Sequence, residues 1–242
     1  MKTLLITGAS SGIGKATAVE AALQGWKVVA CGRNQARLDE LRTLHPNIET
    51  LAFDITDTAE CQRALNTLRI DAAILNAGTC EYVDVDEWEV ELFRRVFDAN
   101  FFGVINCLQS LLPNLRRGNQ LIFIDSLARM LPFTRSQAYG ASKAALFYLA
   151  KSLDVDLRHR GICIQTISPG FVKTPLTDKN QFSMPMQISA EQAAKAIMKD
   201  VTKKTTTGYF PALFAGIIRA LSSLPVSWQT AVCRRLKQQH SA

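Results

Sequence analysis

The 242 residues of the chain are 48% hydrophobic and 20% charged, the balance of an ordinary soluble globular protein. This length is sufficient for one large domain, and no change in composition marks a second one. The net charge of +7 comes from basic residues spread along the chain without a base-reading motif, which argues against nucleic acid as a partner.

Short apolar runs rich in β-branched residues alternate along the chain with segments of helical period. Strands are predicted at residues 3–7, 27–31, 48–53, 71–75, 120–125 and 162–167, with a weaker one at 206–210. Helices are predicted at residues 12–24, 34–44, 57–68, 86–115, 137–159 and 189–203. This alternation predicts a single α/β domain over residues 1–242, a three-layer doubly wound parallel sheet of about seven strands, the Rossmann fold.

The first predicted strand leads directly into residues 7–14, TGASSGIG, and a helix follows them. Glycines here allow a tight turn and a close approach of the backbone to a pyrophosphate. The start of the helix adds unpaired N–H groups and a positive dipole end. Glycine-rich turns are common, so the strand before and the helix after give this pattern its weight. It predicts a dinucleotide site.

The end of the second strand indicates which dinucleotide is bound. An NAD site places a carboxylate here, whereas an arginine accommodates the additional phosphate of NADP. Gly32 stands where the acid would be, and Arg33 and Asn34 follow it. We therefore expect NADP(H) to be preferred over NAD(H), the alternative being that Arg33 is a solvated loop charge. Two further strand ends, Asp54–Ile55 and residues 76–78, are expected near the adenine and the rest of the cofactor.

Ser126 follows the fifth predicted strand, and Tyr139 and Lys143 follow on a predicted helix. Their i,i+4 spacing places the phenol and the ammonium on one side of that helix. Because a neighbouring cation stabilises a phenolate, we expect Lys143 to lower the pKa of Tyr139 from about 10. Tyr139 would then exchange a proton with a carbonyl or alcohol oxygen that Ser126 holds. The alternative, an aromatic–lysine pair on a helix surface, is disfavoured by the preceding dinucleotide pattern.

Several motifs occur in the order typical of one family: TGASSGIG at 7–14, NAG at 76–78, Asn100 in FDANFFG, Ser126, YGASK at 139–143 and SPGFVKT at 168–174. The chain resembles the short-chain dehydrogenase/reductase family of the single-domain kind over residues 3–200. The resemblance implies that Asn100 completes a catalytic tetrad by holding a water near Lys143. It also implies that Lys143 binds the nicotinamide ribose, that Thr174 and Val172 contact the carboxamide, and that Pro169–Gly170 shapes the turn.

Together, the motifs and the resemblance give one set of residues expected to bind the cofactor. They are Gly8, Ser10, Ser11, Gly12, Ile13, Gly14, Arg33, Asn34, Asp54, Ile55, Asn76, Ala77, Gly78, Tyr139, Lys143, Pro169, Gly170, Val172 and Thr174.

The substrate end is less well defined by the sequence. The loop 175–188 is either a lid or a segment packed permanently on the body. Arg129 could pair with a substrate carboxylate, although an exposed loop arginine is the favoured interpretation. The residues expected around the carbonyl are Leu127, Ala128, Arg129, Phe133 and Phe182, together with Cys80 and Tyr82.

The C-terminal extension 211–242 contains an apolar helical face and a basic amphipathic segment. It could cover the substrate site, pack at a subunit interface, or lie on an anionic membrane surface. Packing on protein is favoured. The resemblance implies a homodimer or homotetramer formed through the long helices 86–115 and 137–159.

The sequence therefore predicts an NADP(H)-dependent oxidoreductase that reduces a carbonyl to an alcohol or catalyses the reverse reaction. A 3-ketoacyl-carrier-protein reductase is an alternative substrate assignment. A non-catalytic NADP-binding sensor or scaffold is disfavoured, because Asn100, Ser126, Tyr139 and Lys143 are all retained. The six cysteines have no metal-ligand or CxxC spacing, and the apolar run before Gly8 is short for a signal peptide. We therefore expect a cytoplasmic protein without a metal.

Overall fold

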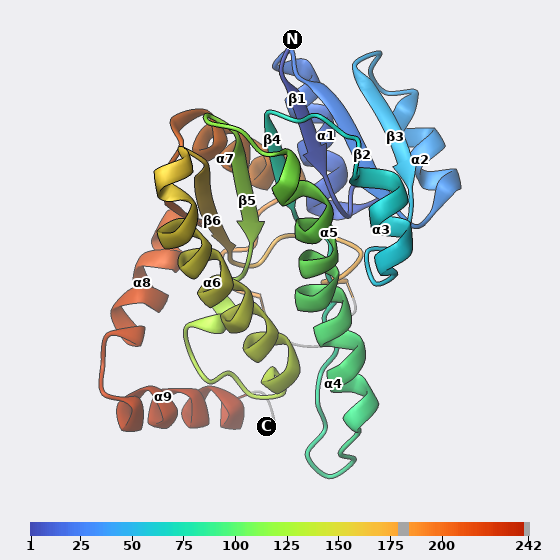
Figure 1. Cartoon of the computed structure of the whole chain (residues 1–242). Coiled ribbons are helices and arrows are strands. Elements are labelled where there is room, and N and C mark those ends of the chain that lie inside the picture. Colours follow the sequence, from blue (N-terminus) through green and yellow to red (C-terminus); the bar gives the residue numbers. More distant parts are fainter. Residues whose placement is uncertain (179–183, 240–242) are drawn as a thin grey trace.

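The computed structural model of the chain describes residues 1–178 and 184–239 (Figure 1). In this part of the chain, seven parallel strands form one sheet in the order β3-β2-β1-β4-β5-β6-β7. The strands are β1 (Thr3–Ile6), β2 (Lys27–Gly32), β3 (Ile48–Ala52), β4 (Ala72–Leu75), β5 (Gln120–Ile124), β6 (Cys163–Pro169) and β7 (Thr207–Phe210). The predicted doubly wound sheet is confirmed. Its order reverses between β1 and β4, and in such sheets ligands bind beyond the strand ends at this point.

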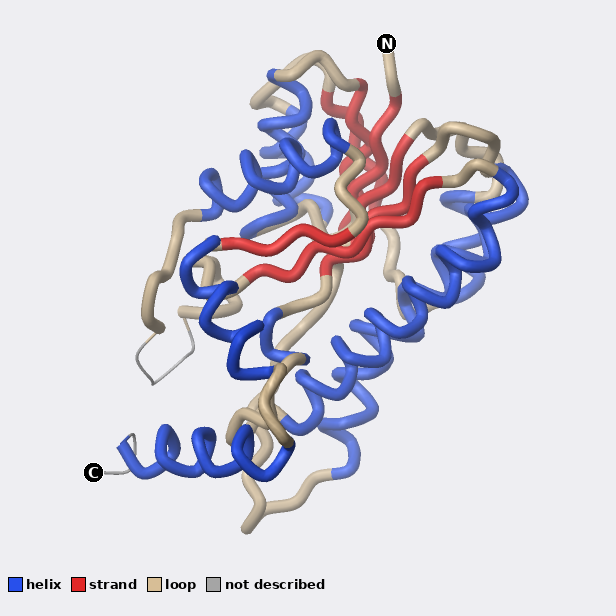
Figure 2. Tube along the Cα trace, turned by 90° about the vertical axis from the view of Figure 1, so that its left-hand side faces the viewer, coloured by secondary structure: helices blue, strands red, loops and turns tan. Residues whose placement is uncertain are grey.

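The helices form two layers, one on each face of the sheet (Figure 2). Ser189 begins α7 with the predicted capping box, in which its hydroxyl accepts from the backbone of Gln192, and Asp57 caps α3. The α-helices are α1 (Gly12–Leu23), α2 (Gln35–Arg42), α3 (Thr58–Leu65), α4 (Val90–Phe97), α5 (Gly103–Leu111), α6 (Gln137–Leu157), α7 (Ala190–Lys203), α8 (Ala212–Ser222) and α9 (Val226–Gln239).

Alternate side chains of the strands β1 to β6 enter two separate apolar cores. Leu4 and Ile6 of β1 pack in one core with residues of α1 and α7. Leu5 of β1 and Phe123 of β5 pack in the other, with residues of α3, α5 and α6. Because successive side chains of a strand point to opposite faces, both faces must be apolar when helices cover both. This explains why the strands appear in the sequence as continuous apolar runs.

The prediction of one helix over residues 86–115 is wrong. The helix begins at Val90, and Trp88 before it is exposed. A π-helical turn at Asp98–Phe102 separates α4 from α5, and a 3₁₀ turn at Leu112–Asn114 follows α5. A π turn accommodates one residue more than an α-helical turn. Here it carries the buried Asn100.

The C-terminal extension folds back onto the body of the protein as α8 and α9 (Figure 1). Ala215 and Ile218 of α8 and Cys233 of α9 are buried against Leu127 and Leu131. The buried faces of α8 and α9 therefore pack on the body of the protein, as expected. Among the residues that the structure describes, no helix is both long enough and apolar enough to cross a membrane.

Candidate active site

The glycine-rich turn between β1 and α1 is built so closely that side chains do not fit. Gly8 and Gly12 have φ angles of +68° and +53°, which favour glycine. A Cβ added to Gly14 would lie 2.2 Å from the Gly8 carbonyl oxygen. The Asn76 side chain donates to the Thr7 carbonyl at 3.0 Å, so the end of β4 is tied to this turn. The turn leaves its backbone open to an anion at the start of α1, and it fits a dinucleotide pyrophosphate.

The end of β2 presents Arg33, which is exposed and paired with Asp54. The guanidinium Nη1 lies 3.3 Å from a carboxylate oxygen of Asp54. Burial opposes ionisation of Asp54, but hydrogen bonds from Thr56 and the Arg33 charge hold the pKa of this carboxyl below its ordinary value. A Cβ on Gly32 would lie 3.1 Å from the Ser10 hydroxyl, so an acidic side chain has little room there.

Ser126 at the end of β5 meets Tyr139 and Lys143 of α6. The Ser126 hydroxyl lies beside the Tyr139 phenol, and it accepts a bond from the Ala128 N–H at 3.1 Å. The Lys143 ammonium donates to the Ile124 carbonyl at 2.9 Å and lies 5.9 Å from the centre of the Tyr139 ring. The structure therefore brings the three predicted side chains together at the edge of the sheet where cofactors bind.

Burial governs the protonation of this group. Burial raises the pKa of Tyr139 above its ordinary value, because a buried phenolate is poorly solvated. The charges of Cys80 and Asp125 act in the same direction, and the Ser126 hydroxyl opposes them. Burial also lowers the pKa of Lys143 to about 8, with Asp125 opposing this change. The pKa of Tyr139 therefore lies above its ordinary value, and the expected net lowering of this pKa is wrong. Tyr139 is a protonated phenol at neutral pH.

Asn100 links the loop after β4 to α6 beside Lys143. Its amide nitrogen donates to the Thr79 carbonyl and to the Ser142 hydroxyl, each at 2.9 Å. Its amide oxygen accepts from the Thr79 N–H at 2.7 Å. A Cβ on Gly78 would lie 2.6 Å from this oxygen and 3.4 Å from the Lys143 nitrogen. The π-helical turn thus places Asn100 next to the lysine.

These features agree with comparisons against known proteins. A family model described as short chain dehydrogenase matches residues 2–185. The chain belongs to the short-chain dehydrogenase family. It is 34% identical to an uncharacterized oxidoreductase of Myxococcus xanthus, over 98% of each chain. It is 35% identical to a serine 3-dehydrogenase of Rhizobium radiobacter, over 72% of this chain and 74% of that one.

The structural comparison gives the same family. A serine dehydrogenase described as the closed form complexed with NADP+ has a TM-score of 0.78 and is 25% identical. The similarity covers 86% of this chain and 94% of the other chain.

The environment of Arg129 differs from the one that the sequence favoured. Its side chain is 9% exposed, and its Nε donates to a carboxylate oxygen of Asp125 at 2.7 Å. The guanidinium also stacks on Phe147, with its carbon 3.4 Å from the ring centre. The expectation of an exposed loop arginine is wrong, because α6 and the Asp125 carboxylate enclose the side chain.

The remaining predicted residues occupy several positions around the site. Thr174 lies against the glycine-rich turn, since its methyl would be 3.1 Å from a Cβ on Gly12. Val172 is buried, and Phe133 is partly buried in the cluster below α8. Phe182 lies outside the described residues.

The sequence did not indicate Asp125 or Phe147, and it indicated Phe214 only as part of the apolar face of the C-terminal extension. The i,i+4 spacing of Asp125 and Arg129 is a signal that could have revealed their ion pair. Phe214 of α8 lies against Gly170, where a Cβ would meet its ring at 2.8 Å. No local pattern joins positions so far apart in the chain.

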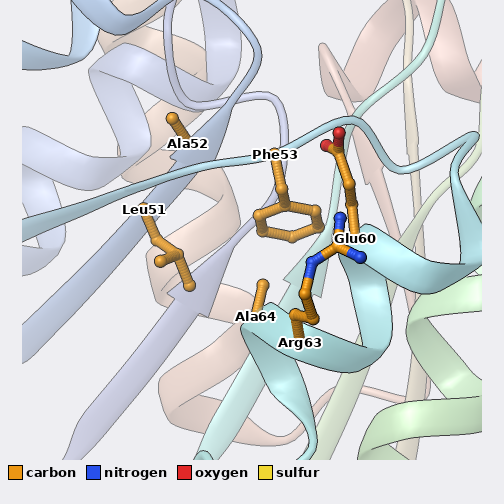
Figure 3. Close-up of a pocket in the computed structure, with 6 residues that line it drawn as sticks. All are labelled: Leu51, Ala52, Phe53, Glu60, Arg63 and Ala64. Atoms are coloured by element: carbon orange, nitrogen blue, oxygen red, sulfur yellow. The ribbon is translucent and has the colours of Figure 1, made fainter.

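A hollow of about 380 Å³ lies between β3 and α3 (Figure 3). None of its lining residues belongs to the predicted site, and three strands separate β3 from β5 in the sheet. The hollow is lined by Leu51, Ala52, Phe53, Glu60, Arg63 and Ala64.

Proposed function

We propose that this protein is an NADP(H)-dependent oxidoreductase that interconverts a carbonyl and an alcohol, with Tyr139 as general acid and base. The convergence of Ser126, Tyr139 and Lys143 at the end of β5 is the observation that carries the proposal. A hydroxyl and a phenol that meet at the end of a central strand can both reach one substrate oxygen. The family relationship supports an oxidoreductase.

In the reductive direction, bound NADPH supplies the hydride to the carbonyl carbon. Tyr139 donates its phenolic proton to the carbonyl oxygen, which completes the alcohol. Ser126 holds that oxygen by a hydrogen bond, and the Lys143 ammonium stabilises the phenolate that remains. The raised pKa of Tyr139 keeps the phenol protonated at pH 7, as a proton donor requires. Asn100 positions the loop and helix that flank Lys143, and a water held there would return the proton.

We assign the cofactor preference to Arg33. Gly32 leaves no carboxylate at the end of β2, and the adjacent guanidinium can bind a phosphate in place of Asp54. The relative described as complexed with NADP+ supports the same preference. The residues of the glycine-rich turn, of 54–55 and 76–78, and of the segment 169–174 would hold the rest of the cofactor.

Paired titrations with NADPH and NADH test this assignment. We expect Arg33→Ala to reduce the preference for NADPH about ten-fold, because one charge-assisted contact is lost. Arg42→Ala, at the far end of the exposed helix α2, is the matched control and should leave the ratio unchanged. An unchanged preference in Arg33→Ala would contradict the assignment.

The catalytic proposal is tested with the purified protein, NADPH and a panel of ketones and aldehydes. We expect NADPH oxidation with some members of the panel, and we expect Tyr139→Phe to abolish it while NADPH binding persists. Turnover that survives Tyr139→Phe would refute the mechanism. Cofactor binding without turnover of any carbonyl would favour a sensor or scaffold.

Assembly and location are further parts of the proposal. Tyr148 and Val155 of α6 are 78% and 77% exposed, and Phe102 beside α5 is half exposed. Exposed apolar side chains on α6 and beside α5 support a homodimer or homotetramer formed through these two helices. Light scattering on the eluting protein measures its mass, and a monomer would contradict this part. We also propose a cytoplasmic location, in keeping with the free cysteines.

A further inference from the structure

Two of the charges next to Ser126, those of Asp125 and Arg129, neutralise each other within the protein. Asp125 and Arg129 form an ion pair across the short 3₁₀ turn that begins after Ser126. The guanidinium lies between the Asp125 carboxylate and the ring of Phe147, and its Nη2 is 3.4 Å from the Ser168 hydroxyl. An enclosed arginine that already has a carboxylate partner has little attraction left for the carboxylate of a substrate.

An apolar and aromatic cluster includes the residues that follow Ser126 in the chain. We call this cluster the apolar wall; it joins the segment after Ser126 to β7, α8 and α9. Leu127 follows Ser126 directly and lies in the buried part of the wall. The partly buried side chains of the wall are Met130, Phe133, Tyr209, Phe214 and Leu221.

The apolar wall extends to the end of β6, where the nicotinamide is expected. The Phe214 ring lies against Gly170, and its centre is 5.5 Å from that of Phe171. The exposed Arg219 borders the wall, and its guanidinium carbon lies 4.7 Å from the centre of the Tyr209 ring. The wall therefore borders the reaction site from Ser126 to Gly170.

From these two observations we infer that the substrate is an uncharged carbonyl compound with an apolar chain or ring. This inference rests on the proposed function and specifies its substrate class. The Asp125–Arg129 pair makes the site unsuited to carboxylates, and the apolar wall accommodates the rest of the molecule. The serine 3-dehydrogenase relative is named for serine, a zwitterion that carries a carboxylate. We expect serine to be a poor substrate of this protein.

Straight-chain methyl ketones from hexanone to decanone, each paired with the keto acid that carries a carboxylate at the far end, test the inference. With NADPH, we expect kcat/KM to rise about four-fold per added methylene of the ketone. We expect each keto acid to be at least about ten-fold worse than its ketone, as a buried charge without a partner predicts. Equal or better turnover of the keto acids would overturn the inference and leave the reductase function intact.

Binding measurements distinguish a failure of the substrate-class inference from a failure of the proposed function. The Tyr139→Phe protein loaded with NADPH is titrated calorimetrically with decanone and with its keto acid. Tighter binding of decanone supports the apolar class even if no turnover is found, whereas tighter binding of the keto acid overturns it. Absence of turnover in the unmodified protein with every ketone would count against the proposed function alone.

Variants of the ion pair test the role of Arg129. Asp125→Asn removes the partner of this arginine, so we expect the preference for ketone over keto acid to fall about ten-fold, as one uncompensated charge predicts. The double variant Asp125→Asn with Arg129→Met should restore the preference, which also controls for misfolding of the single variant. Arg219→Gln should leave the preference unchanged. The inference would be overturned if Arg129→Met or Arg219→Gln lost turnover of the keto acids and kept turnover of the ketones.

Discussion

Lys143 is the residue for which activity and stability should conflict most clearly. Its ammonium is buried, and burial lowers its pKa from 10.5 to about 8. At about 1.36 kcal/mol per pH unit, this difference corresponds to roughly 3 kcal/mol of unfavourable free energy for the charged form at pH 7. Lys143→Met removes that cost and loses the hydrogen bond to Ile124, which is worth about 1 kcal/mol. We therefore expect the variant to be inactive and about 2 kcal/mol more stable at pH 7.

The pH dependence of this gain follows from proton binding. The unfolded chain keeps the lysine proton up to a pKa of about 10.4. The folded protein releases this proton near pH 8. Between these values the unfolded state binds more protons, so the unmodified protein becomes more stable as the pH rises. The advantage of Lys143→Met should therefore shrink above pH 8 and disappear before pH 10.5.

Urea unfolding followed by circular dichroism at pH 7, 8.5 and 10 measures these free energies. Lys195→Met on α7 is the control, because this lysine is exposed and its replacement should leave stability almost unchanged at each pH. A Lys143→Met protein that is less stable than the unmodified one at pH 7 would refute the reasoning. So would a gain that stays constant from pH 7 to 10.

Two further substitutions test the glycine-rich turn and the catalytic tetrad. Gly14→Ala should weaken NADPH binding more than about ten-fold and lower Tm, because its Cβ would lie 2.2 Å from the Gly8 carbonyl oxygen. Gly216→Ala on α8 is the control, because a Cβ there meets no atom within 4 Å. Calorimetry should show unchanged NADPH binding and up to about 1 kcal/mol of added stability. Asn100→Ala should cost about 2 kcal/mol or more in urea unfolding and reduce kcat, since Thr79 and Ser142 lose their partner. Stability equal to that of the unmodified protein would contradict this role.

The sheet and most of the helices could be predicted because they depend on local patterns of apolar and polar residues in the sequence. Runs such as residues 120–125 are apolar on both faces, and Gly14 and Tyr139 stand in motifs whose spacing carries the chemistry. The break in the helix predicted over 86–115 could not be seen, because the apolar periodicity passes through the π-helical turn without interruption.

Other features depend on contacts between distant parts of the chain. The sequence places Lys143 one helical turn after Tyr139, but only the folded structure determines how deeply both are buried. Burial reverses the expected direction of the tyrosine pKa. Arg129 is enclosed by Phe147, which belongs to a later helix. The position of Phe214 against Gly170 likewise depends on the return of the C-terminal extension.

The π-helical turn at Asp98–Phe102 limits how this segment can change in length. Deleting one residue from it would give an ordinary α-helix, but α4 would then rotate by about 100° relative to α5. Val96 of α4, which is buried with Ala138 of α6, would leave its contact, and Asn100 would turn away from Ser142. Single-residue insertions and deletions should therefore be tolerated in the exposed loop 84–88 and rejected between Val90 and Leu111. The number of residues in this segment should then be constant among related chains.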